Sequence, residues 1–143
     1  MDAFFQQALS MITPHYLKVW TVAKKAQWRL RHPVLTSEHL LFACLRLIDP
    51  RFDICKKLPV NANSVWDHLR DNPPVEEASE DICGLRLGVS AKAALDRADS
   101  EAAKHGWVAT GSASLLLALL AESEGPVRTL LDAAAHAIPE KEL

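Results

Sequence analysis

The strongest constraint on the fold is an internal repeat with a fixed spacing. Residues 35–45 read LTSEHLLFACL, and residues 110–120 read TGSASLLLALL. The two copies are 75 positions apart, because Glu38 corresponds to Ala113 (113 − 38 = 75). The residues upstream of each copy keep the same offset. A repeat of this kind predicts two copies of one structural unit that bury their apolar faces against each other.

Apolar residues recur at helical spacing through both copies. A central helix is predicted over residues 37–47, with Thr36 as its N-cap. In the second copy, Ser90 is expected to cap the first helix, and Gly111 or Ser112 to open the next. No stretch alternates apolar and polar residues for long, so we expect no sheet. The predicted class is all-α, with two pseudo-symmetric four-helix repeats packed into one compact helical domain.

Composition and turn residues divide the chain into four parts. Residues 1–12 form a short amphipathic lead, and residues 13–70 form the first repeat. Residues 71–87 contain two adjacent prolines and five acidic side chains, which predicts a solvated acidic linker. Residues 88–143 hold the second repeat and a charged tail.

The overall composition argues against several classes of function. The 143 residues carry 16 basic and 18 acidic side chains, and this net charge of −2 does not favour nucleic acid as a partner. The three cysteines lack CxxC spacing and are typical of free thiols in a reducing compartment. The longest aliphatic run is far short of the ~20 residues that span a bilayer. We therefore expect a cytoplasmic protein without membrane, metal or cofactor.

The run AKKAQWRLRHPVLTSEHLLFACL, which begins at Ala23, resembles the repeat of the Clp N-terminal domain. This domain stands at the front of Clp-type AAA+ unfoldases. The run SEHLL at residues 37–41 matches the family's first repeat. Val89, Ser90 and the leucine-rich run at 115–120 match the second repeat. The resemblance covers about residues 12–138 and implies an all-α, non-catalytic fold.

The chain departs from the family pattern at several positions. Ala113-Ser114 stands where the family usually has Glu-His, and Arg31-His32 stands where it has Gly-His. The lead at residues 1–12 is longer than usual. The phosphate-binding pattern GxxxxGK[ST] of the family's ATPase modules is absent from the sequence. We therefore expect the chain neither to bind nor to hydrolyse ATP.

Glu38 is the main candidate for a binding residue. The resemblance implies that the glutamate of this motif helps to bind phosphorylated arginine, and a carboxylate can pair with a guanidinium in bidentate geometry. The expected partner-binding residues are Thr36, Ser37, Glu38 and Ser112. Because Glu38 begins a helix beside two hydroxyls, we expect it near the surface. Ala113 leaves one competent site at most. The alternative is that Glu38 only stabilises its helix.

Other notable side chains have simpler interpretations. His39 is expected to be partly buried and hydrogen-bonded within its repeat, and Cys44 to lie in the core. Trp66 and Trp107 are interpreted as packing residues. Basic and aromatic residues alternate along residues 20–31 in a way that imitates a nucleic-acid patch, but a solvated helix face is the preferred interpretation.

The sequence favours a non-catalytic protein-recognition module. It would dock substrates, adaptors or partner peptides for an ATP-dependent Clp-type unfoldase or protease, through an apolar groove between the repeats. The alternative is an accessory subunit that binds and stabilises a Clp proteolytic core, as small two-repeat plant relatives do, which would place it in a plastid stroma. An enzyme is the least favoured class, because no nucleophile–base pair can be placed.

Overall fold

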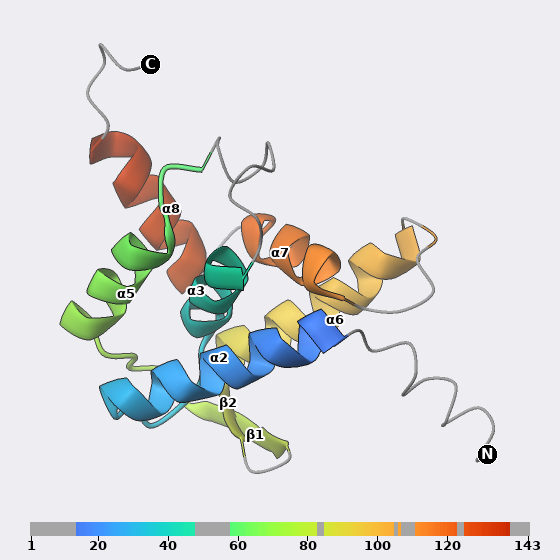
Figure 1. Cartoon of the computed structure of the whole chain (residues 1–143), viewed down its shortest axis with the longest axis horizontal. Coiled ribbons are helices and arrows are strands. Elements are labelled where there is room, and N and C mark those ends of the chain that lie inside the picture. Colours follow the sequence, from blue (N-terminus) through green and yellow to red (C-terminus); the bar gives the residue numbers. More distant parts are fainter. Residues whose placement is uncertain are drawn as a thin grey trace.

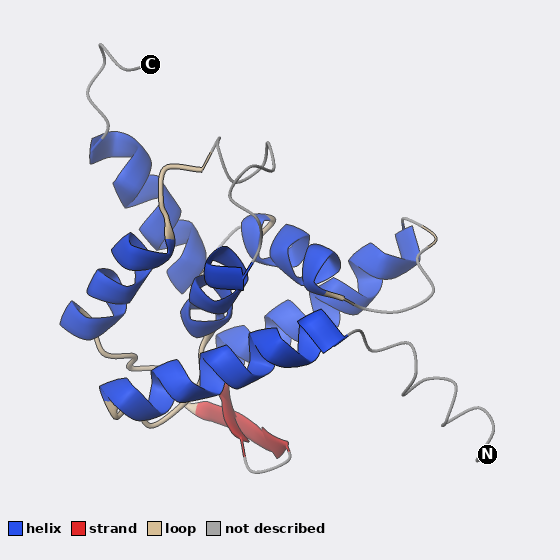
Figure 2. Cartoon of the chain, viewed as in Figure 1, coloured by secondary structure: helices blue, strands red, loops and turns tan. Residues whose placement is uncertain are grey.

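The structure is a computed structural model that describes residues 14–47, 58–82, 85–104, 106, 111–122 and 125–137. The predicted lead at residues 1–12 and Trp107 lie outside these ranges. The all-α class is confirmed, because the described part of the chain is mainly helical (Figure 2). Its helices are α2 (Pro14–Leu30), α3 (Ser37–Leu47), α5 (Ala62–Asp71), α6 (Val89–Lys104), α7 (Ser112–Leu120) and α8 (Pro126–Ala137).

The internal repeat appears directly in the helix boundaries. Helices α2 and α6 begin 75 positions apart (89 − 14 = 75), and so do α3 and α7 (112 − 37 = 75). Helix α2 packs against α3, and α6 packs in the same way against α7. The two central helices, α3 and α7, also contact each other, as the repeat predicted. The first two helices of each repeat are therefore equivalent.

Helix α3 is the centre of the molecule. It contacts α2, α5, α6, α7 and α8, and Figure 1 shows it between α5 and α8 on one side and α6 and α7 on the other. The side chains of Leu40, Leu41 and Cys44 are fully buried in this helix, and Leu116 of α7 is also buried. Cys44 lies in the core, as predicted. The buried position of α3 explains why residues 40–45 are almost all apolar.

The expectation of no sheet was wrong. Strands β1 (Ala78–Ile82) and β2 (Leu85–Gly88) form an antiparallel hairpin (Figure 2). The backbone N–H of Leu35 donates to the Arg86 carbonyl at 2.8 Å, and that of Gly88 donates to the Leu35 carbonyl at 2.8 Å. Each strand is only four or five residues long, so alternation could not reveal it. The segment predicted as a solvated linker thus contains paired strands, and Leu87 is buried.

The turn after the first helix of each repeat has the same backbone conformation. Gly106 has a φ of 69°, as expected for a glycine that ends a helix. Arg31 occupies the equivalent position (106 − 31 = 75) and has a φ of 57°, which is unusual for a residue with a side chain. The first repeat therefore keeps the left-handed turn although it lacks the glycine that suits it.

Candidate functional site

The candidate site is built around the first turn of α3. The backbone N–H of Thr36 donates to Nδ1 of His39 at 2.8 Å, and the Thr36 hydroxyl oxygen lies 3.0 Å from the same nitrogen. The Leu40 N–H donates to the Thr36 carbonyl. His39 therefore takes the part that Glu or Gln plays three residues after the N-cap in a capping box. The predicted helix start at Thr36 and Ser37 is confirmed.

The second repeat closes the start of α7 in the same way. The backbone N–H of Gly111 donates to Oγ of Ser114 at 2.9 Å, and Gly111 and Ser114 correspond to Thr36 and His39 at the repeat offset. The Ser114 hydroxyl thus accepts in the second repeat the backbone N–H that is equivalent to the one the His39 imidazole accepts in the first. The departure from the family pattern at Ser114 consequently preserves the helix start, while Ala113 removes the carboxylate.

His39 is a structural residue. Its ring is fully buried, and its Nε2 lies 2.9 Å from Nδ1 of His32, which is also buried. Since His39 Nδ1 accepts the Thr36 N–H, the partners assign the ring proton to Nε2, which donates to His32. Burial, together with the neighbouring His32, lowers the pKa of His39 to about 3. The imidazole is therefore neutral at pH 7. It is hydrogen-bonded within its repeat, as predicted, but it is fully buried and not partly buried as expected.

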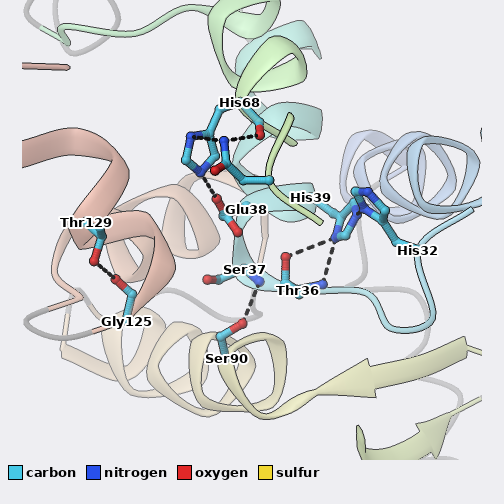
Figure 3. Close-up of polar contacts among 10 residues, drawn as sticks. His32, Thr36, Ser37, Glu38, His39, His68, Ser90, Gly125 and Thr129 are labelled. Carbon is cyan, nitrogen blue, oxygen red and sulfur yellow. Dashed lines mark hydrogen bonds and ion pairs between the residues drawn. The ribbon is translucent and has the colours of Figure 1, made fainter. Parts of the chain in front are cut away.

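Glu38 points in the opposite direction, toward α5 (Figure 3). Its Oε2 lies 2.7 Å from Nε2 of His68, and the residue is only 5% exposed. The expectation that Glu38 lies near the surface was wrong, because α5 packs against α3 and places His68 over the carboxylate. Asn72 Nδ2 lies 3.4 Å from His68 Nδ1. Oε2 of Glu38 is buried and has no partner with hydrogen-bond geometry in the described residues, so its contact with His68 is one of close distance only.

The carboxyl group of Glu38 titrates near neutral pH. Burial raises the pKa of Glu38 to about 7, and the nearby Glu76 carboxylate contributes to this rise. Burial lowers the pKa of the His68 imidazole, although Asp71 opposes the shift. At pH 7 the contact therefore joins a neutral imidazole to a carboxyl group that is close to half ionised.

Two further carboxylates lie at neighbouring helix starts. Oε1 of Glu76 accepts the Ser90 backbone N–H at 3.0 Å and the Ser90 hydroxyl at 2.7 Å. Ser90 lies inside the first turn of α6, so the predicted cap at this position is supplied by Glu76. The Ser90 hydroxyl oxygen in turn accepts the Ser37 backbone N–H at 2.9 Å (Figure 3). Glu122 is buried before α8, and burial raises its pKa.

The structure brings together three of the four expected partner-binding residues. Thr36 and Ser37 have no exposed surface, and Glu38 has very little, so all three lie beneath the surface. Ser112 is the first residue of α7, at the position that corresponds to Ser37. His68, whose side chain is 30% exposed, lies between α5 and the Glu38 carboxylate and would have to move for a partner to approach from that side.

An open groove lies elsewhere, within the first repeat. It has a volume of about 440 Å³ and is formed by α2, α3 and α5. The groove expected from the sequence was between the repeats, but this one is not. In the sequence, this groove was indicated only in part, by the mixture of basic and apolar residues along α2. The lining residues are Val22, Lys25, Ala26, Arg29, Phe42, Arg46, Asn63 and Trp66.

The chain was compared with known families and structures. The sequence profile of the Clp repeat (R) N-terminal domain matches residues 11–134, which is most of the chain. The chain belongs to the Clp repeat N-terminal domain family. Domains of this family are non-catalytic N-terminal modules of Clp-type chaperones. A comparison with curated protein sequences found no match.

A solved structure supports the fold of this Clp repeat domain. It is the N-terminal domain of the caseinolytic protease associated chaperone ClpD from Arabidopsis thaliana. The two share 14% sequence identity with a TM-score of 0.66, over 89% of this chain and 94% of that one. At this identity the likeness establishes the fold alone.

Neither a metal-binding cluster nor a membrane-spanning helix is present in the described residues. They contain no group of three or more His, Cys, Asp or Glu side chains placed to hold a metal ion. No helix within the same ranges is both long and apolar enough to cross a membrane.

Proposed function

We propose that this Clp repeat domain docks a substrate, an adaptor or a partner peptide for an ATP-dependent Clp-type unfoldase or protease. The observation that carries the proposal is the open groove between α2, α3 and α5, where apolar side chains lie beside solvent-exposed cations. Its volume of about 440 Å³ lies within the ~300–1,000 Å³ typical of ligand pockets. Membership of a chaperone-module family favours a protein as the ligand.

Binding to separate components tests this role. The purified chain is immobilised and exposed in turn to an unfolded model protein, a Clp-type unfoldase and a Clp proteolytic core. A docking module binds the unfolded protein or the unfoldase in a saturable way. Binding to the proteolytic core alone would contradict the docking role and favour the accessory-subunit alternative.

The finer part of the proposal concerns cation recognition at Glu38. In this proposal a guanidinium of the partner, in the form of phosphoarginine, pairs with Glu38 after His68 has moved aside. Thr36, Ser37 and Ser112 mark the neighbouring helix starts, where the helix dipole favours an anion such as phosphate. The Thr36 and Ser37 N–H groups already donate to His39 and Ser90, so the phosphate would be favoured by the dipole and not by these two groups. The raised pKa of Glu38 supports this role, because a new cationic partner would relieve the cost of ionising a buried carboxylate.

Phosphoarginine titrations can separate this proposal from a purely structural role of Glu38. A charged hydrogen bond is worth ~1.5–3 kcal/mol, so Glu38→Gln should weaken binding by roughly ten- to a hundredfold. His68→Ala should strengthen binding, because it removes the competing partner at 2.7 Å. Binding should weaken from pH 8 to pH 6, since a carboxyl with a pKa of about 7 loses its charge over this interval.

The opposite outcome is equally clear. If the wild type, Glu38→Gln and His68→Ala proteins bind phosphoarginine equally, Glu38 has only its structural role at the start of α3. Docking would then be assigned to the groove. Circular dichroism of each variant is the control that the fold is intact.

A further inference from the structure

The groove between α2, α3 and α5 has an apolar floor. Phe42 of α3 and Trp66 of α5 contact each other there, with ring centroids 5.2 Å apart. Ala26 is buried, whereas Val22 and Trp66 are half-buried and keep part of their surface open. These side chains offer apolar area that the chain itself leaves uncovered, which is a feature of interaction sites.

The rim of the same groove is positively charged. Lys25 and Arg29 stand on α2 and Arg46 on α3, and all three are exposed. None of the eight lining residues is acidic. None of the three cations forms an ion pair with another residue in the described ranges. This concentration of positive charge contrasts with the net charge of −2 of the whole chain.

An exposed tryptophan stands beside this rim. Trp28 is 65% exposed on α2, three residues after Lys25 and one before Arg29. The Lys24 ammonium lies over the Trp28 ring, 4.8 Å from its centroid, in a cation–π contact. Tryptophan and arginine are the side chains most often found at the centre of protein interfaces. The groove and its edge therefore combine apolar anchors with cations.

We propose that this groove binds an amphipathic segment of a partner protein whose apolar side chains are flanked by Asp or Glu. The apolar side chains would cover the floor, and the carboxylates would pair with Lys25, Arg29 and Arg46. The inference rests on the proposed docking function and specifies the chemistry of the docked segment. It concerns a different surface from Glu38, which would take a cation.

The groove itself argues against two other occupants. A small anion would leave the floor of Val22, Phe42 and Trp66 uncovered. A nucleic acid could stack a base on Trp28, which lies outside the groove lining, but it would leave the floor uncovered, because the floor is aliphatic or already in ring–ring contact. A peptide with both apolar and acidic side chains uses every part of the lining.

Two labelled synthetic peptides test the inference with the full chain. Both span about four helical turns and carry leucines at i, i+3, i+4 and i+7. One has Glu at the flanking positions, and the other has Lys. Fluorescence anisotropy should show tighter binding of the Glu peptide. This preference should shrink as ionic strength rises, because salt screens exposed charges.

Asn63 provides a sharp variant. It is exposed, lines the groove and lies in the first turn of α5, where a negative charge suits the helix dipole. Asn63→Glu should therefore fold normally, yet weaken the Glu peptide roughly two- to tenfold through like-charge repulsion. Arg46→Glu should act in the same direction. Lys18→Glu, which makes a charge reversal on α2 outside the groove, is the control and should leave affinity unchanged.

Four results would overturn the inference. Equal binding of both peptides, unaffected by Asn63→Glu, would place peptide docking elsewhere while leaving the proposed function intact. Failure of both peptides to bind while the unfolded model protein still binds would have the same meaning. Tighter binding of a single-stranded oligonucleotide would make the groove a nucleic-acid site. A dimer that Asn63→Glu dissociates would make a second copy of the chain the occupant.

Discussion

Acid should destabilise this domain mainly through one buried histidine. The folded protein keeps His39 neutral, because its ring is fully buried and its pKa is lowered to about 3 by burial and by His32. In the unfolded chain the same group titrates near 6.5. Below pH 6.5 the unfolded state therefore binds a proton that the folded state does not, and stability falls as the pH falls toward 3.

The size of this effect follows from the two pKa values. Between pH 6.5 and pH 4 the penalty grows by about 1.4 kcal/mol per pH unit, which gives about 3 kcal/mol for His39 alone. His39→Gln removes the titrating group and retains a side chain that can accept the Thr36 N–H, as in an ordinary capping box. The variant should therefore lose about 3 kcal/mol less stability over the same interval.

Urea unfolding followed by circular dichroism at pH 7 and pH 4 measures both proteins. The difference between them isolates His39, because the other titrating groups are common to both. Glu38, for example, works in the opposite direction: its pKa is raised, so its protonation at low pH favours the folded state in both proteins. If the variant loses as much stability as the wild type, the assignment of acid sensitivity to His39 is refuted.

Two further predictions concern backbone positions. Arg31→Gly should stabilise the fold by about 0.5–1 kcal/mol in urea unfolding. A left-handed residue with a side chain costs ~1–2 kcal/mol, and the greater backbone entropy of glycine in the unfolded chain offsets only part of this gain. A less stable variant would show that the Arg31 backbone is not strained. Gly88→Ala should cost about 1–3 kcal/mol, because the new Cβ would displace the Glu76 carboxylate from Ser90. If both substitutions disrupt the same contact, the double variant Gly88→Ala/Glu76→Ala should lose little more stability than Gly88→Ala alone. Additive losses of stability would show that Gly88→Ala acts in some way other than by displacing Glu76.

The sequence predicted the parts of the fold that repeat. The starts of α3 and α7, the buried face that includes Leu41 and Leu116, and the capping role near Thr36 follow from local pattern and a constant offset. The residues in these helices pack mainly against other helices of the same repeat, which the repeat pattern already predicts. Helical periodicity predicted these helices well because the apolar residues at helical spacing are the ones that are buried.

The parts that could not be predicted depend on tertiary neighbours. Strand β1 reads ASEDI, a sequence with little intrinsic preference for strands, and the hairpin is held by Leu35, about fifty residues upstream. Glu38 was expected near the surface because its own helix start is polar, but α5 covers it with His68. The groove was misplaced because its walls come from three helices that only folding brings together.

The hydrogen bonds of Leu35 bear on how the molecule unfolds. Its N–H and carbonyl pair with Arg86 and Gly88, at the junction with the second repeat, and the Ser90 hydroxyl accepts a hydrogen bond from the first turn of α3. Unfolding of the second repeat alone would strip these partners from the centre of the first. The two halves should therefore exchange their most protected amide hydrogens at the same rate, as one cooperative unit. A duplicated sequence has in this way become a single folding unit.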